Sequence, residues 1–170
     1  MAPKYVFIGP PGSGKSSTGR ALARTLKLDF ADTDALIEKM QGKTVGQIFV
    51  EDGEPQFRAL EESICVSALR NFPGVLSLGG GAVLSVLVQE ALVNCRAEII
   101  FLDVNLSVAA PRIGFNRDRP LLLGNPRQQW QKLMDARRPI YEGLATLRIE
   151  TLNHSVTDVV KEILSKVSHS

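Results

Sequence analysis

Short runs of apolar residues alternate along the chain with longer segments in which apolar residues recur every three or four positions. The short runs are typical of buried strands, and the longer segments are typical of helices with one buried face. This alternation predicts βαβ units and a parallel sheet. The predicted strands are Lys4–Ile8, Leu28–Phe30, Val75–Leu78, Glu98–Leu102 and Thr146–Glu150. The predicted helices are Lys15–Leu26, Thr33–Met40, Val45–Glu51, Pro55–Arg70, Leu84–Val93, Leu106–Ile113, Pro126–Ala145 and Val156–Val167.

One connection between predicted helices, Gly114–Pro126, has no apolar periodicity. It carries Arg117 and Arg119 together with proline and glycine. Such a connection in a small nucleotide-binding enzyme predicts a mobile lid, although a plain surface loop has the same composition. We therefore expect a lid at about residues 112–125. Pro111 should end or kink the helix before it.

Length and composition restrict the class of protein. A chain of 170 residues can bury a substantial core, so we predict a single domain over residues 1–170. The net charge of +2 and the aromatic content of 6% argue against a nucleic-acid or membrane-surface protein. The first apolar run is short and is followed by Gly9–Pro11, which is unlike a signal peptide and predicts a cytoplasmic protein. Cys65 and Cys95 lie within apolar patterns, which indicates buried free thiols.

The segment Gly9–Ser17, GPPGSGKSS, directly follows the first predicted strand. It fits the P-loop motif, G-x-x-x-x-G-K-[ST]. In this motif, glycines let backbone N–H groups surround a phosphate at the positive end of the next helix. Lys15 should then reach the β- and γ-phosphates of a nucleotide, and the Ser16 hydroxyl should bind Mg²⁺. The alternative is a simple glycine-rich turn, but every motif position and both flanks are in place.

Two aspartates, Asp32 and Asp34, come at the end of the second predicted strand. Ligands of open α/β sheets bind at the carboxyl ends of strands, and alternate residues of an extended segment point the same way. One carboxylate could support a metal while the other contacts the acceptor, whereas helix capping explains only one of them. The glycines Gly79–Gly81 follow the third predicted strand. They would let backbone N–H groups approach a ligand, or they form a permissive turn.

Arginines supply a third set of candidates. Arg58 precedes Glu61 by three positions and Glu62 by four, a spacing that also suits a simple helical ion pair. A guanidinium binds a carboxylate or phosphate through two parallel hydrogen bonds. In a chain without a large net positive charge, arginines near a P-loop indicate a small anionic ligand, although any single one can be a solvated surface residue. The others lie in or around the predicted lid: Arg112, Arg117, Arg119, Arg137 and Arg138.

The chain resembles the shikimate kinase family over Lys4–Glu150, and its pattern is most similar to the actinobacterial members. Six segments occur in that family's order and spacing: GPPGSGKSS, FADTD, GEPQFRALE, SLGGGAV, RDRPLL and RRPIYEGLA. The P-loop is common to many proteins, but the combination is much more specific. The resemblance implies an α/β, three-layer P-loop kinase fold with a five-stranded parallel sheet and a mobile lid. It also implies transfer of the ATP γ-phosphoryl group to the 3-hydroxyl of shikimate, a step of chorismate and aromatic amino-acid biosynthesis.

The resemblance further implies roles for individual residues. Lys15 and Arg119 would neutralise the transferred phosphoryl group, and Asp34 would orient or deprotonate the acceptor hydroxyl. One Mg²⁺ ion would bind Ser16, with Asp32 in its outer coordination shell. The ATP site would comprise Gly12, Ser13, Gly14, Lys15, Ser16, Ser17, Arg112, Arg119 and His154. The shikimate site would comprise Asp34, Arg58, Gly79, Gly80, Gly81 and Arg137.

Three of these assignments depend on local details. The family pattern R-x-P-x-Y selects Arg137 over Arg138, and Pro139 should disfavour the helical conformation at Arg138. Pro111 puts the position of Arg112 in question. His154 stands where a basic residue often occurs in the family, and it either contacts adenine or is simply solvated.

Two other interpretations stay open at this point. Gluconate or adenylate kinase would share the P-loop and the fold, but those families are not expected to combine FADTD with RRPIY. A P-loop regulatory protein would bind nucleotide and signal to a partner, and it would not need carboxylate-binding arginines. The expected partners are ATP and shikimate, without nucleic acid or membrane, and we expect a monomer.

Overall fold

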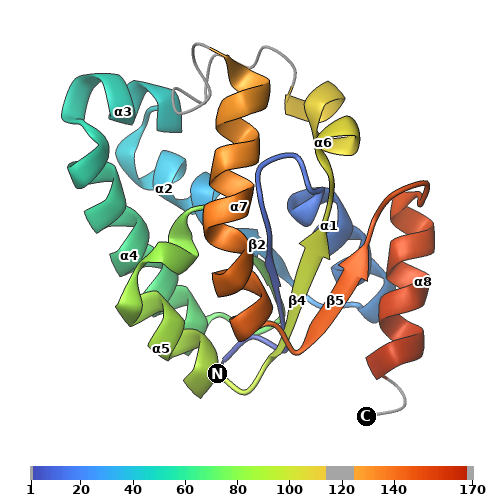
Figure 1. The fold of residues 1–170 in the computed structure, drawn as a ribbon. Helices are drawn as coiled ribbons and strands as arrows, with labels where there is room; N and C mark the ends of the chain where they lie inside the picture. Colours follow the sequence, from blue (N-terminus) through green and yellow to red (C-terminus); the bar gives the residue numbers. More distant parts are fainter. Residues whose placement is uncertain (1, 114–124, 168–170) are drawn as a thin grey trace.

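The computed structural model describes residues 2–113 and 125–167, and its middle layer is a five-stranded parallel sheet in the order β2-β3-β1-β4-β5 (Figure 1). The strands are β1 (Tyr5–Ile8), β2 (Phe30–Asp32), β3 (Val75–Ser77), β4 (Glu98–Asp103) and β5 (Leu147–Glu150). The helices are α1 (Lys15–Leu26), α2 (Thr33–Gln41), α3 (Val45–Asp52), α4 (Glu54–Asn71), α5 (Val86–Asn94), α6 (Leu106–Ile113), α7 (Pro126–Leu144) and α8 (Val156–Val167), with a 3₁₀ turn η1 (Ala82–Leu84).

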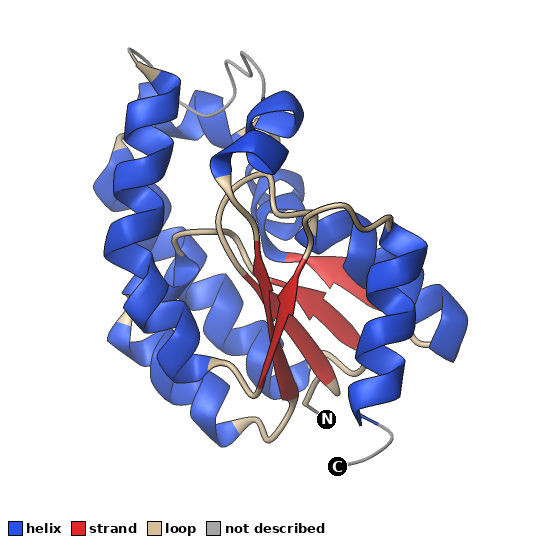
Figure 2. Ribbon diagram, turned by 45° about the vertical axis from the view of Figure 1, so that its right-hand side comes forward, coloured by secondary structure: helices blue, strands red, loops and turns tan. Residues whose placement is uncertain are grey.

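Helices cover both faces of the sheet, which gives three layers (Figure 2). On one face, α1 and α8 pack against a cluster that contains Phe7 and Ile100. On the other, α4, α5 and α7 pack against Val6 and Ile8. Successive side chains of β1 thus point to opposite faces of the sheet, as the pleat of a strand requires. The central strand is buried on both sides, and the loop that follows it is therefore held at a fixed height above the sheet.

A smaller apolar cluster joins α2, α3 and α4 beyond the β2 edge of the sheet. It contains Ile37, Ile48, Phe57 and Ile64, all buried. Thr44 and Gln47 form a reciprocal capping box at the start of α3, which satisfies N–H groups there. This cluster positions the amino-terminal turns of α2 and α4 close to the carboxyl end of β2.

All the predicted strands and helices are present, with shifted ends. The second strand lies later than predicted, at Phe30–Asp32, and the helix predicted from Leu84 begins at Val86 after η1. Among the described residues, no helix has the length and apolar character needed to cross a membrane. Cys65 is buried as expected, but Cys95 is only half-buried because it caps the exposed end of α5.

The two prolines predicted to disturb helices do not end them. Helix α6 continues through Pro111 to Ile113, and α7 continues through Pro139, so that Arg138 is helical, contrary to the expectation. A proline removes a single N–H donor from a helix. In α7, buried side chains such as Met134 and Tyr141 lie on both sides of that point and hold the helix against the sheet. The predicted lid at residues 112–125 lies almost entirely outside the described residues.

Candidate active site

The carboxyl ends of the strands open onto a cleft of about 400 Å³. This is the edge where ligands of parallel α/β sheets bind. Segments that follow all five strands contribute to its walls, so distant parts of the chain meet there. The cleft is lined by residues 11–18, Asp32, Asp34, Ser77, Leu78, Gly79, Gly80, Arg112, Ile113, Thr151, His154, Val156 and Val159.

The P-loop between β1 and α1 has the backbone that its sequence predicts. Gly12 and Gly14 have φ values of +81° and +89°, in the left-handed region that favours glycine. Gly14 directly precedes the first turn of α1. The Lys15 ammonium group donates to the carbonyl oxygens of Gly9 (2.8 Å) and Pro10 (3.1 Å), so the side chain lies across the mouth of the loop.

Asp32 connects the P-loop helix to α2. Its carboxylate accepts a hydrogen bond from the Ser16 hydroxyl, and it also caps α2 by accepting from the backbone N–H groups of Asp34 (2.8 Å) and Ala35 (3.3 Å). The chain is therefore not extended through Asp34, as the alternation argument assumed, because α2 already begins at Thr33. Both aspartates nevertheless line the cleft, Asp32 from the end of β2 and Asp34 from the first turn of α2.

Each of the three glycines after β3 borders a different charged side chain, and Gly79 and Gly81 leave no space for a Cβ atom beside theirs. A Cβ atom on Gly79 would lie 2.6 Å from Asp34 Oδ1, and one on Gly81 would lie 2.8 Å from the Cζ atom of Arg58. A Cβ atom on Gly80 would lie 3.5 Å from Arg137 Nη1. The glycine turn thus gathers three predicted site residues around itself: Asp34, Arg58 and Arg137.

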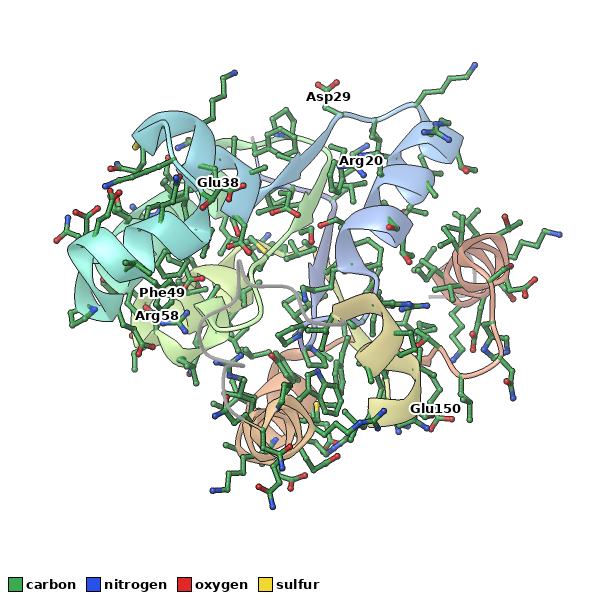
Figure 3. All side chains as sticks on the ribbon, turned by 90° about the horizontal axis from the view of Figure 1, so that it is seen from above. Arg20, Asp29, Glu38, Phe49, Arg58 and Glu150 are labelled. Atoms are coloured by element: carbon green, nitrogen blue, oxygen red, sulfur yellow. The ribbon has the colours of Figure 1, made fainter. Side chains whose placement is uncertain are left out.

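A buried carboxylate, Glu61, lies within this group. Arg58 Nη1 donates to Glu61 Oε1 at 2.7 Å, and only 3% of Glu61 is exposed. Burial raises the pKa of the Glu61 carboxyl, and the positive charges of Arg58 and Arg137 oppose this only in part. Arg58 also lies beside the rings of Phe49 and Phe57, at 6.0 and 5.4 Å from their centroids, and Figure 3 shows it next to Phe49.

Two hydroxyl groups hold the glycine turn in place. The Gly79 N–H donates to Thr33 Oγ1 at 3.0 Å, and the Tyr141 hydroxyl donates to the Gly80 carbonyl oxygen at 2.6 Å. Burial raises the pKa of Tyr141 to about 12. The sequence analysis did not assign a role to either hydroxyl, although both residues stand inside the segments FADTD and RRPIYEGLA. The Gly79 N–H is engaged within the protein and is not directed at a ligand.

Residues at the opposite edge of the sheet, near β4 and β5, line the other end of the cleft. Arg112 Nη1 donates to the Gly12 carbonyl oxygen at 3.1 Å, and His154 Nδ1 lies 3.1 Å from the Glu150 carbonyl oxygen. Both side chains border the cleft beside the P-loop and lie far from the glycine turn in the strand order. Arg119, predicted to close onto the phosphates, lies outside the described residues.

The adjacent arginines of α7 serve different parts of the molecule. Arg137 is 4% exposed and faces the glycine turn. Arg138 points away from it and binds the Asp103 carboxylate through two hydrogen bonds of 2.8 and 3.0 Å. Arg148 Nε donates to the same carboxylate at 2.8 Å. Burial acts to raise the pKa of Asp103, but the hydrogen bonds from the two arginines outweigh it and keep that pKa below its ordinary value.

Comparison with known proteins identifies the fold and the family. The model of the family described as "Shikimate kinase" matches residues 11–168. The chain is 48% identical to the shikimate kinase of Thermobifida fusca, over 96% of this chain and 94% of that one. It is 46% identical to the shikimate kinase of Rhodococcus erythropolis, over 98% of both chains. Among solved structures, the shikimate kinase from Acinetobacter baumannii in complex with shikimate superposes with a TM-score of 0.94 at 31% identity, over 99% of this chain and 94% of that one. Asp34, Gly79 and Gly80 join the P-loop in the wall of the cleft, and Arg58 and Arg137 lie behind that wall against the glycine turn. With this site and this similarity to actinobacterial shikimate kinases over nearly its whole length, the chain belongs to the shikimate kinase family of ATP-dependent kinases.

Proposed function

We propose that the protein phosphorylates the 3-hydroxyl of shikimate with ATP bound at the P-loop and shikimate bound among Asp34, Arg58 and Arg137. The observation that carries this proposal is the glycine turn, where three consecutive glycines each border one of these side chains. Shikimate has one carboxylate and several hydroxyl groups. Two guanidinium groups and one carboxylate in a single pocket match that pattern of charge and hydrogen bonding.

The charges of the pocket are balanced before a ligand binds. Arg58 and Arg137 supply two positive charges, and ionised Glu61 and Asp34 supply two negative charges, with Glu61 bonded to Arg58 at 2.7 Å. A substrate carboxylate would therefore be bound by the placement of the guanidinium groups and not by an excess of positive charge. Because Arg137 and Glu61 are almost fully buried, each charge has few other partners, and an unpaired charge there is costly. We propose that the two arginines clamp the carboxylate of shikimate.

Chemistry at the acceptor requires orientation more than a strong base. The acceptor hydroxyl oxygen forms a bond to the γ-phosphorus while the bond to the β–γ bridging oxygen breaks, and ADP leaves. We propose that Asp34 orients this hydroxyl and accepts its proton. Lys15 would exchange its bonds to the carbonyl oxygens of Gly9 and Pro10 for bonds to the phosphates. Arg119 would add positive charge from the segment outside the described residues.

The P-loop and its surroundings suit a triphosphate. The Ser13 hydroxyl is 1% exposed and has no hydrogen-bond partner among the described residues, and a phosphate oxygen would satisfy it. The backbone N–H groups at residues 12–17 and the amino terminus of α1 provide the rest of the anion site. We propose that Arg112 and His154 contact the adenine end of the nucleotide.

The residues beside the P-loop also fit Mg²⁺. No group of three or more metal-binding His, Cys, Asp or Glu side chains occurs in the described part of the chain, which argues against a metal held by the protein alone. Mg²⁺ prefers oxygen ligands and binds nucleotide sites through one or two protein groups plus phosphates and water. The Ser16 hydroxyl and the Asp32 carboxylate, already in contact, would hold it. When bound, the ion supplies charge neutralisation on the phosphate oxygens.

We further propose that the enzyme acts as a cytoplasmic monomer with ATP and shikimate as its partners. The net charge of +2 gives no electrostatic basis for binding nucleic acid or an anionic membrane. The cytoplasm is where ATP is available to a kinase.

ADP release with a panel of acceptors tests the proposed function. We expect release with shikimate and background rates with gluconate, with each nucleoside monophosphate and without acceptor. The methyl ester of shikimate, which lacks the carboxylate charge, should be used poorly, and 3-deoxyshikimate should not be phosphorylated. Equal use of shikimate and its methyl ester would contradict the arginine clamp. Phosphorylation of 3-deoxyshikimate would contradict the assigned hydroxyl.

A further inference from the structure

The P-loop is held from outside the cleft as well as from within it. The Trp130 indole, only 1% exposed, donates from Nε1 to the Pro11 carbonyl oxygen at 2.8 Å. Trp130 belongs to α7 and lies 119 positions from Pro11 along the chain. It is absent from the walls of the cleft that the P-loop lines, and it borders a separate apolar cavity between α6 and α7. Trp130 therefore contacts the side of the loop that faces away from the ligand.

The direction of this bond determines where the next N–H group points. In a planar trans peptide, the C=O and N–H groups point in opposite directions. The Pro11 carbonyl is directed at Trp130, which does not line the cleft, so the N–H of Gly12 in the same peptide is directed away from Trp130. A fixed N–H donor at this position binds phosphate without a cost of reorientation.

The opposite side of the same turn is also constrained. A Cβ atom on Gly12 would lie 2.9 Å from Ile113 Cγ1 and 3.0 Å from the Ala109 carbonyl oxygen, so the turn packs directly on α6. Arg112 donates to the Gly12 carbonyl oxygen. Of the two side-chain hydrogen bonds to this turn, the one from Trp130 is buried and the one from Arg112 is exposed.

We propose that Trp130 is a positioning residue for ATP: its indole N–H fixes the Pro11–Gly12 peptide so that the Gly12 N–H is directed at the nucleotide phosphates. The proposal rests on the proposed ATP site at the P-loop. We expect its main effect on the nucleotide, because the peptide that it holds belongs to the P-loop. The Pro11 ring also borders the glycine turn, since a Cβ atom on Gly80 would lie 3.2 Å from Pro11 Cδ, so the KM for shikimate is measured beside the KM for ATP.

The test removes the N–H donor while keeping the ring. Trp130→Phe is the simple variant. Because the chain has one tryptophan, the indole can also be replaced throughout the protein by 3-benzothienylalanine, which keeps the bicyclic shape and has sulfur in place of N–H. Met134→Leu, one turn further along α7 and equally buried, is the control for packing. For each protein we would measure the KM for ATP, the KM for shikimate, kcat and the melting temperature.

We expect the benzothienyl protein and Trp130→Phe to show a KM for ATP raised about fivefold to tenfold, the size expected when a buried carbonyl loses its partner. The KM for shikimate should stay within about twofold of wild type, and Met134→Leu should change neither. An unchanged KM for ATP in the benzothienyl protein overturns the proposal. A parallel rise in both KM values, or a failure of that protein to fold, also overturns it, because the bond would then be structural. Lys15→Ala, measured in parallel, distinguishes a failure of the proposed ATP site from a failure of the role of Trp130. If Lys15→Ala stays active, the ATP site itself is wrongly assigned.

Discussion

The two proposed halves of the active site, one for the nucleotide and one for the acceptor, are built in different ways. The nucleotide half consists mainly of backbone groups from one continuous loop, Gly9–Ser17, closed by a lysine of the same loop. The acceptor half consists of side chains from α2, α4 and α7 that meet around a glycine turn after β3. The first half is a local structure that a short motif specifies. The second exists only when the whole fold is assembled, and its specificity can change one side chain at a time.

The largest effect should come from Lys15, the one side chain that the P-loop motif directs at the β- and γ-phosphates. Lys15→Ala should lower kcat on the order of 10³-fold, a loss comparable to removal of a transition-state donor. The fold should persist because the bonds of the ammonium group to the Gly9 and Pro10 carbonyl oxygens lie within one loop at a solvated cleft. The measurement is ADP release, with circular dichroism as the control for folding. A folded variant with near-normal turnover would remove the P-loop from the mechanism.

Asp34→Asn should have the next largest effect, and it should impair catalysis at the acceptor without weakening nucleotide binding. We expect kcat to fall on the order of 10²-fold, since general base and orienting groups contribute at least that much. ADP affinity, measured by calorimetry, should stay within about twofold, because Asp34 borders Gly79 in the acceptor half. A comparable loss of ADP affinity would instead assign Asp34 to the nucleotide half.

The adjacent arginines of α7 offer a matched pair. Arg137→Ala should raise the KM for shikimate at least about tenfold, the cost of a charged hydrogen bond, and Arg137→Lys should rescue it only partly because an ammonium group lacks the planar fork. Arg138→Ala should leave that KM nearly unchanged and lower the unfolding free energy by about 1 kcal/mol, since it bonds to Asp103 instead. If Arg138→Ala is the variant with impaired shikimate use, the assignment along α7 is off by one residue.

The smallest effect concerns pH and Glu61. Because its pKa is raised in the folded state, the folded protein holds this proton more tightly than the unfolded chain does. Glu61 therefore adds stability that is fully present below its ordinary pKa of 4.5 and is lost as pH rises through the folded-state value. Glu61→Gln has no titratable group at this position. The free energy of unfolding of wild type minus that of Glu61→Gln should therefore decrease from pH 4 toward neutrality. Urea unfolding at several pH values measures this. A difference that grows with pH would give the shift the opposite sign.

The sequence predicted the nucleotide half better than the acceptor half, and the reason is the range of the contacts. The left-handed backbone at Gly12 and Gly14 and the bonds from Lys15 to Gly9 and Pro10 lie within one short segment, so spacing alone indicates this geometry. The bond from Trp130 to Pro11 joins residues that no short pattern connects. The extended conformation assumed for Asp34 was wrong because Asp32 starts a helix there, and capping by one side chain outweighed strand alternation.

The acceptor residues were predicted from family resemblance, and their surroundings were not. The three glycines after β3 were interpreted as access for backbone N–H groups or as a permissive turn, and the structure adds that Gly79 and Gly81 leave space for Asp34 and Arg58 while Gly80 borders Arg137. Such complementarity depends on three helices packed at fixed distances from one turn. Similarly, α7 runs through Pro139 because packing on both sides of the proline outweighs the loss of one hydrogen bond.

The order of the strands and helices along the chain determines how late in ribosomal synthesis the site can form. The central strand β1 is made first, but its neighbours in the sheet are β3 and β4, which are made later. Trp130, which bonds to the P-loop, and Arg137, which borders the glycine turn, both belong to α7 in the last third of the chain. A nascent chain that stops before α7 contains the whole P-loop sequence without the groups that fix Pro11 or bind a carboxylate beside Gly80. Each proposed half of the active site therefore needs one residue of α7, and a chain that ends before α7 has neither half complete.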